Sequence, residues 1–442
     1  MRNLKNDKVI KLLSGLFDDG NFMEINPCVN SDDDTASLIC VHGKVNEKYV
    51  YAFAQNSEIN GGAVCRNNVI KLKKLYSLAL KTGAPIVGIY DSCGGNLNEG
   101  NELLIEYNTI LCECNRLSGV VPQVSIILGM CFGISAVIAS SADVLIMNKK
   151  AKCGLDIGGD NSDYVNCEKS GVSHITCENN EECIFKARKI LSMLPSNNIS
   201  SVLQLDYIEP NISENLNLSN PYSVIDNLVD GGSFVEFQKN FGRSFVTGLS
   251  TIKGNTVGII ISTDENSGTI DADSCVKISR FIRVCDSYSI PCITMINANK
   301  FNSLKEASRV CSVYSEATCV KITVIIGRAC GAVNVAFCGQ NSIDVVLSWE
   351  TAVISALPPE TAVEVLWHDR LKNTGYNTSG LRKTLENEYL KEQSSSFLAC
   401  KSGLAQEIIS ESQTREKISY YLSMLVNKRE FRLPKKHSNM RI

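Results

Sequence analysis

The chain repeats itself once, and this duplication limits its possible folds more than any other feature of the sequence. Segment 16–24, Leu-Phe-Asp-Asp-Gly-Asn-Phe-Met-Glu, recurs at 228–236 as Leu-Val-Asp-Gly-Gly-Ser-Phe-Val-Glu. Five further matches follow in the same order. They pair 41–43 with 246–248, Gly62, Lys71 and Pro85 with Gly268, Lys277 and Pro291, 126–129 with 324–327, Gly133 with Gly331, and 142–145 with 343–346. Two copies of one structural unit are therefore predicted.

Each copy alternates short apolar runs with amphipathic stretches. The expected strands are 49–53, 86–90 and 124–128 in the first copy and 257–261, 292–296 and 322–326 in the second; the expected helices include 69–80 and 276–287. Apolar strands that alternate with helices predict an α/β fold with stacked, mostly parallel sheets covered by helices.

A chain of 442 residues suits two domains of about 200 residues each. The stretch 196–221 is rich in Asn and Ser, which is typical of a linker. We place an N-terminal domain at 1–205, a linker at 206–221 and a C-terminal domain at 222–442. A polar, helical tail is expected after about Lys372.

Composition and charge exclude several functional classes. The net charge of −3 argues against a nucleic-acid partner, because phosphate binding needs a basic face. The apolar segment 119–147 is interrupted by Pro122 and glycines, so a buried strand and helix are expected instead of a membrane span. Nineteen cysteines without a C-x-x-C motif indicate buried thiols in a reducing, cytoplasmic compartment. No metal site is expected.

Candidate functional positions lie where a buried strand meets a glycine turn and a helix. Both copies contain such a turn, at 129–135 and at 327–334. Backbone N–H groups at a helix start lack intrahelical partners and can bind a developing oxyanion. The plain alternative is that the glycines only permit tight turns or close packing. A second glycine loop, 91–100, contains Gly94 and Gly95 and follows a predicted parallel strand, where α/β sheets bind ligands.

The motifs along the chain resemble those of the carboxyltransferase family of biotin-dependent acyl-CoA carboxylases and decarboxylases. The matching stretches are Leu-Ala-Leu-Lys-Thr-Gly-Ala-Pro at 78–85 with Asp91-Ser92, Ser-Gly-Val-Val-Pro-Gln at 118–123, Ser-Gly-Val-Ser-His at 170–174, Leu-Pro-Ser-Asn-Asn at 194–198, the Arg-Phe, Cys-Asp and Pro positions of 280–291, and Pro-Lys-Lys-His-Ser-Asn at 434–439. They cover nearly the whole chain in the order of the family.

The resemblance implies two tandem crotonase-like domains with one oxyanion hole each. One hole would hold the enolate of an acyl-CoA thioester, and the other would hold the ureido oxygen of biotin. Carried over by position, the catalytic residues are Gly133 and Ile134 in the first hole and Gly331 and Ala332 in the second. The implied substrate-binding residues are Gly94, Gly95, Asn96, Asn297, Phe301 and Asn334.

The implied reaction moves a carboxyl group between biotin and the α-carbon of a short acyl-CoA, either propionyl/methylmalonyl-CoA or acetyl/malonyl-CoA, in a direction the residues leave open. Biotin would be attached to a separate carrier protein, because no biotinyl Ala-Met-Lys-Met motif is present. The other implied partners are a biotin carboxylase or membrane decarboxylase subunits, in a homo- or hetero-hexamer with a paralogous carboxyltransferase.

Two alternatives remain open at this stage. Ile134 stands where the family has glycine, and Asn96 stands where it has arginine. These departures would suit a catalytically weak structural subunit paired with an active paralogue. A biotin-independent crotonase-like enzyme is the third interpretation.

Overall fold

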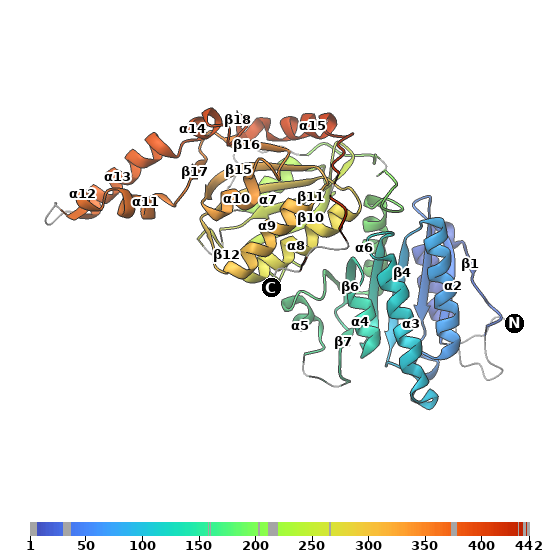
Figure 1. Ribbon diagram of the computed structural model, residues 1–442. Helices are drawn as coiled ribbons and strands as arrows, with labels where there is room; N and C mark the ends of the chain where they lie inside the picture. The colour runs from blue at the N-terminus through green and yellow to red at the C-terminus, as the bar shows by residue number, and fades with distance from the viewer. Residues whose placement is uncertain are drawn as a thin grey trace. The chain divides into compact units, whose positions relative to one another are not determined.

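The computed structural model describes residues 7–29, 37–157, 159, 161–201, 204–210, 220–264, 267–372, 378–431, 433–435 and 439. The chain divides into two compact units (Figure 1). The first contains residues 1–203 together with 237–241, and the second contains 204–236 and 242–442. The linker prediction falls partly on 211–219 and His437 falls in the C-terminal segment, and both lie outside the described residues. The boundaries at 205 and 222 stay a proposal.

The first unit is built on an eight-stranded sheet with strand order β1-β2-β3-β4-β5-β6-β8, in which β7 also pairs with β5. The strands are β1 (Phe22–Glu24), β2 (Leu38–Val45), β3 (Lys48–Gln55), β4 (Ile86–Ser92), β5 (Gln123–Phe132), β6 (Val144–Asn148), β7 (Lys152–Gly154) and β8 (Ile175–Cys177). The pairs β1–β2 and β2–β3 are antiparallel, and every later pair is parallel.

The second sheet repeats this order as β9-β10-β11-β13-β15-β16-β18, with β17 paired to β15. Its strands are β9 (Val235–Phe237), β10 (Phe245–Ile252), β11 (Asn255–Ser262), β13 (Cys292–Ala298), β15 (Lys321–Cys330), β16 (Val345–Trp349), β17 (Val353–Ser355) and β18 (Glu407–Ile409). The hairpin β10–β11 is antiparallel and the strands after it are parallel. The predicted duplication of one α/β unit is therefore confirmed.

Helices cover both faces of each sheet. The first unit contains α1 (Asp7–Leu16), α2 (Arg66–Thr82), α3 (Glu102–Leu117), α4 (Ile134–Ser140), α5 (Tyr164–Lys169) and α6 (Asn180–Met193). The second contains α7 (Pro221–Leu228), α8 (Ala272–Ser287), α9 (Leu304–Glu316), α10 (Ala332–Cys338), α11 (Pro359–Leu366), α12 (His368–Lys372), α13 (Thr378–Gln393), α14 (Ser396–Lys401) and α15 (Thr414–Met424). A small pair, β12 (Thr269–Ile270) and β14 (Lys300–Phe301), completes it. Paired helices, α2 with α3 and α8 with α9, occupy equivalent places (Figure 1).

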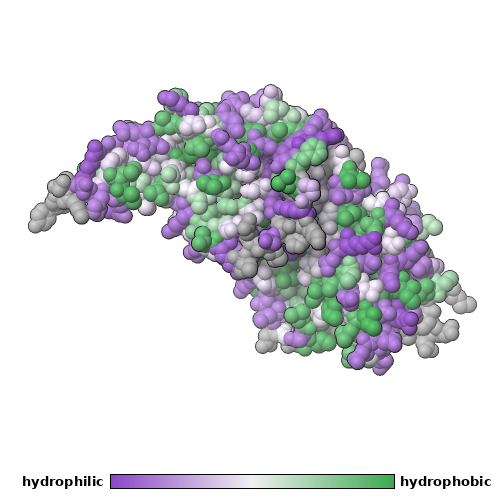
Figure 2. Space-filling view, in the orientation of Figure 1, coloured by the Kyte–Doolittle hydropathy of each residue, from purple (hydrophilic) through white to green (hydrophobic). Residues whose placement is uncertain are grey.

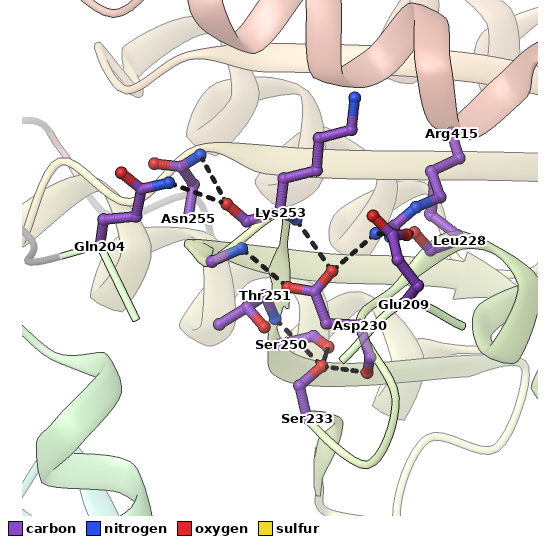
Figure 3. A network of polar contacts seen from close by, with 11 residues as sticks. Gln204, Glu209, Leu228, Asp230, Ser233, Ser250, Thr251, Lys253, Asn255 and Arg415 are labelled. Atoms are coloured by element: carbon purple, nitrogen blue, oxygen red, sulfur yellow. Dashed lines mark hydrogen bonds and ion pairs between the residues drawn. The ribbon is translucent and has the colours of Figure 1, made fainter. Parts of the chain in front are cut away.

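A buried acidic residue binds the turn of the first hairpin in the second unit (Figure 3). The Asp230 carboxylate accepts hydrogen bonds from the backbone N–H groups of Lys253 (2.9 Å) and Gly254 (2.8 Å), which form the β10–β11 turn. Arg415 on α15 donates to the same carboxylate at 2.8 Å. Burial raises the pKa of Asp230, but the bonds from Gly254, the Thr251 side chain and Arg415 outweigh it and hold the pKa below its usual value.

The first unit contains an equivalent set of hydrogen bonds around Asp18. Asp18 accepts the N–H groups of Asn46 (3.0 Å) and Glu47 (2.9 Å) in the β2–β3 turn, and Arg188 on α6 donates to it at 2.7 Å. Helix α15 is therefore the counterpart of α6, and the duplication extends to the C-terminal part of the chain.

This equivalence corrects the prediction of a helical tail after Lys372. The chain returns to the sheet as β18, which pairs in parallel with β16, before it forms α15. The three-residue strand is too short to leave a periodic signal in the sequence. Residues 359–401 are thus an insertion between β17 and β18, and Figure 1 shows its helices α11–α13 projecting from the second sheet. The insertion has its own small core of Ala362, Val363, Leu385 and Tyr389.

The apolar segment 119–147 forms β5, α4 and most of β6, as the glycines within it predict. Within the described part of the chain, no helix is both long and apolar enough to span a membrane. Hydrophobic and hydrophilic residues are interspersed over the face drawn in Figure 2.

Candidate functional site

A side chain near the end of β4 contacts the neighbouring strand β5 just before the candidate site. The Oδ1 atom of Asp91 accepts a hydrogen bond from the Met130 N–H at 3.2 Å. A Cβ on Gly129 would collide with this carboxylate, so only glycine allows the approach. The β4–β5 register shifts here, and β5 continues beyond Gly129 to Phe132. The strand is therefore longer than the sequence predicts.

The second unit repeats the arrangement with an amide in place of the carboxylate. Asn297 Oδ1 accepts the Arg328 N–H at 2.9 Å, and a Cβ on Gly327 would collide with the Asn297 side chain. The Asn297 amide also donates to Asp264 at 3.1 Å. The predicted ligand-binding residue Asn297 thus has both ends of its side chain in structural bonds.

The first glycine turn lies between β5 and α4. Gly133 has φ 61° and ψ −134°, a conformation open to glycine and strained for other residues. Its N–H donates to the Gly154 carbonyl on β7 at 3.0 Å, and its carbonyl accepts the N–H groups of Ala136 and Val137. In the described part of the chain, the next N–H groups, on Ile134 and Ser135, have no hydrogen-bond partner.

The second turn has the same construction. Gly331 has φ 51° and ψ −122°, and its N–H donates to the Ser355 carbonyl on β17 at 2.9 Å. A Cβ here would lie 2.9 Å from the Ala356 carbonyl oxygen, so a larger residue is excluded by contact as well as by conformation. The N–H groups of Ala332 and Val333 find no partner among the described residues.

Both turns therefore present a pair of unpartnered N–H groups beside the positive end of a short helix. The prediction named the glycine and the residue after it. In the structure the glycine N–H of each turn is taken up by strand pairing, and the open pair begins one residue later. The prediction did not name Ser135 and Val333, because the strands that accept the glycine N–H groups, β7 and β17, are short and lie more than twenty residues further along the chain.

The loop after β4 lies against the first turn. The Gly94 N–H donates to the Ser92 hydroxyl at 3.1 Å, and the Gly94 carbonyl accepts the Val64 N–H at 2.9 Å. A Cβ on Gly94 would lie 4.0 Å from the Phe132 carbonyl oxygen, which places this loop next to the turn. The N–H of Gly95 has no partner within the described residues. The structure thus brings Gly94 and Gly95 together with Gly133 and Ile134.

The remaining predicted binding residues have mixed surroundings. Asn96 accepts the Asn98 N–H at 3.2 Å and caps a single 3₁₀ turn. Phe301 is half-buried, and its ring stacks on Phe337 of α10 with a centroid distance of 6.0 Å. The Asn334 amide nitrogen, in the first turn of α10, is buried without a partner in the part that the structure describes.

Two side chains beside the first turn have raised pKa values. Burial raises the pKa of Tyr107 on α3 to about 12, against a smaller opposing effect of its bond to Ser135. A hydrogen bond with Cys131 and, to a smaller extent, burial raise the pKa of Cys153 to about 12. At neutral pH these two groups are protonated, so neither supplies a charged side chain to the turn.

The carboxyl transferase domain model matches residues 7–440. The chain belongs to the carboxyl transferase family. It is 30% identical to the methylmalonyl-CoA decarboxylase subunit alpha of Propionigenium modestum, over 97% of this chain and 92% of that protein. It is 28% identical to the propionyl-CoA carboxylase beta chain of Saccharopolyspora erythraea, over 96% of this chain and 88% of that one.

Among solved structures, a transcarboxylase 12S hexamer with methylmalonyl-coenzyme A and methylmalonic acid bound matches with a TM-score of 0.89 at 26% identity. The match covers 98% of this chain and 92% of that one. The family and the two crotonase-like domains that the resemblance implied are thereby confirmed.

Proposed function

We propose that this chain is the carboxyltransferase subunit of a biotin-dependent acyl-CoA carboxylase or decarboxylase. The observation that supports the proposal most is the pair of equivalent turns, each with two unpartnered N–H groups, in a chain of this family. A reaction between two carbonyl-containing ligands needs two sites that stabilise negative oxygen, and the duplicated fold supplies one turn per unit.

In this proposal the first hole is formed by the N–H groups of Ile134 and Ser135 with Gly95 beside them. They would bind the thioester oxygen of the acyl-CoA and stabilise the enolate when the α-carbon loses its proton or carboxyl group. Gly133 acts by its conformation, and Gly94 holds the loop in place. One oxyanion donor contributes about 3 kcal/mol of transition-state stabilisation.

The second hole is formed by the N–H groups of Ala332 and Val333, held by Gly331. Two neighbouring donors without partners fit one carbonyl oxygen, such as that of a cyclic urea. Biotin, when bound there on its carrier protein, supplies the transferable carboxyl group and a ureido nitrogen that accepts the α-proton. Tyr107 and Cys153 beside the first turn are protonated at pH 7, so neither serves as a base.

The substrates we propose are propionyl/methylmalonyl-CoA or acetyl/malonyl-CoA. The relatives named above are a methylmalonyl-CoA decarboxylase subunit and a propionyl-CoA carboxylase chain, which favours propionyl-CoA and methylmalonyl-CoA. The proposed partners are a biotin carboxyl carrier protein, a biotin carboxylase or membrane decarboxylase subunits, and further carboxyltransferase copies in a hexamer. The matched 12S structure is a hexamer, and the exposed Val365 and Leu366 on the insertion offer apolar surface for such contacts.

The test is exchange of an isotopically labelled carboxyl group between methylmalonyl-CoA and free biotin, repeated with malonyl-CoA. The chain is assayed alone and with its partner subunits, and free CoA is measured in parallel. Label in biotin that depends on this chain supports the proposal. Exchange that is unchanged by Gly331→Asp, in a complex that still assembles, favours the structural-subunit alternative. CoA release that is independent of biotin favours a biotin-independent crotonase-like enzyme.

A further inference from the structure

One buried side chain contacts both segments that carry the open N–H groups of the first turn. Tyr107 on α3 lies with its hydroxyl 3.2 Å from the Ser135 hydroxyl on α4, and both residues are buried. Its ring also supports the loop after β4: a Cβ on Gly95 would lie 3.0 Å from the Tyr107 ring edge. The same residue therefore touches the start of α4 and the Gly94–Gly95 loop.

A buried tyrosine on the corresponding helix of the second unit is bonded differently. Tyr314 lies near the end of α9, and its hydroxyl lies 2.8 Å from the Thr294 hydroxyl on strand β13. Both tyrosines are fully or almost fully buried, and the hydroxyl of Tyr314 bonds to a strand and not to a turn helix. Tyr314 therefore serves as a control for the loss of a buried tyrosine hydroxyl.

We propose that Tyr107 is a positioning residue for the first oxyanion hole. Its hydroxyl holds Ser135 in position and its ring holds Gly95 in position. The N–H groups at the start of α4 and in the Gly94–Gly95 loop then point at one ligand oxygen. The proposal rests on the function proposed above. The high pKa of Tyr107 keeps the hydroxyl protonated through the working pH range, so it acts through geometry and takes no part in proton transfer.

The experiment compares Tyr107→Phe, Ser135→Ala and the double variant in the carboxyl-exchange assay with the full complex. Tyr314→Phe, which removes another buried tyrosine hydroxyl, is the control. We expect Tyr107→Phe to lower kcat about tenfold with KM for the acyl-CoA nearly unchanged, less than the 100-fold that a 1 Å misplacement can cost. The double variant should match Ser135→Ala, because Tyr107 acts through that residue. Tyr314→Phe should lose stability and keep its kcat.

Three results would overturn the proposal: a kcat for Tyr107→Phe within twofold of the native value, additive losses in the double variant, or an equal fall in Tyr314→Phe. A pH–rate profile that loses a limb in Tyr107→Phe would also overturn it, because that result assigns proton transfer to the hydroxyl.

A second readout needs no turnover. The N–H groups of Ala136 and Val137 donate to the Gly133 carbonyl, and their hydrogen exchange reports on the order of the turn. Tyr107→Phe should accelerate this exchange, and Tyr314→Phe should leave it unchanged. If the native protein catalyses no carboxyl exchange, only the proposed function is contradicted. If Tyr107→Phe leaves hydrogen exchange unchanged, only the positioning role is contradicted.

Discussion

Proline at position 332 removes one backbone donor from the second turn and little else. Ala332 is the first residue of α10, where proline suits the helix and no intrahelical bond is lost. Its N–H has no partner in the described chain, and its side chain is exposed. The preceding Gly331 has ψ −122°, outside the α region that a following proline disfavours. We therefore expect Ala332→Pro to change stability by no more than about 0.5 kcal/mol.

The effect on activity should be much larger. Loss of one oxyanion donor costs about 100- to 1,000-fold in kcat, or about 2.7–4 kcal/mol. The assay is carboxyl exchange with free biotin, accompanied by a thermal unfolding curve for each variant. Ala332→Gly is the matched control, because it keeps the N–H and weakens the helix by at most about 1 kcal/mol. It should stay within about threefold of the native rate.

The reasoning is refuted if Ala332→Pro retains more than a tenth of the native rate with an intact fold. It is also refuted if Ala332→Gly loses as much activity as the proline variant, because the loss would then reflect helix order and not the donor.

Three further predictions concern stability and assembly. Arg415→Ala should lower the free energy of unfolding in urea by about 3–5 kcal/mol, because it leaves the buried Asp230 carboxylate without its cation. Folding lowers the pKa of Asp230, so the stabilisation by this group should be present above about pH 4 and fall as the pH drops through the folded-state pKa. Gly129→Ala should destabilise the first unit and abolish carboxyl exchange, because the new Cβ collides with a carboxylate. Gly15→Ala on α1 has room for the Cβ and should raise the free energy of unfolding by about 0.5–1 kcal/mol. Urea unfolding measures both variants. Light scattering should show a multimer of this chain at micromolar concentration, and a monomer would contradict the hexamer that we propose.

The sequence was sufficient to predict the two-unit architecture, because the residues shared by the two copies are ones that the fold requires. Gly129 and Gly327 are fixed by a close approach, and Lys71 and Lys277 are both buried, where they donate to the carbonyls of Leu38 and Phe245. Such positions tolerate few residue types, and so both copies kept recognisable patterns.

The details of the candidate site depend on contacts that no local pattern reveals. The glycine N–H groups of both turns are used by β7 and β17, three-residue strands without a periodic signal. The stack of Phe301 on Phe337 joins residues 36 positions apart and forms only in the folded unit. The insertion at 359–401 resembles a tail in sequence because the returning strand β18 is equally short.

The central claim is that each unit supplies one oxyanion hole and that the two holes hold different ligands. A structure of the assembled complex with methylmalonyl-CoA and biotin bound tests it most directly. We predict the thioester oxygen at about 2.7–3.1 Å from the N–H groups of Ile134 and Ser135, and the biotin ureido oxygen at the same distance from those of Ala332 and Val333. Either ligand bound away from its turn, or both on one turn, would contradict the account.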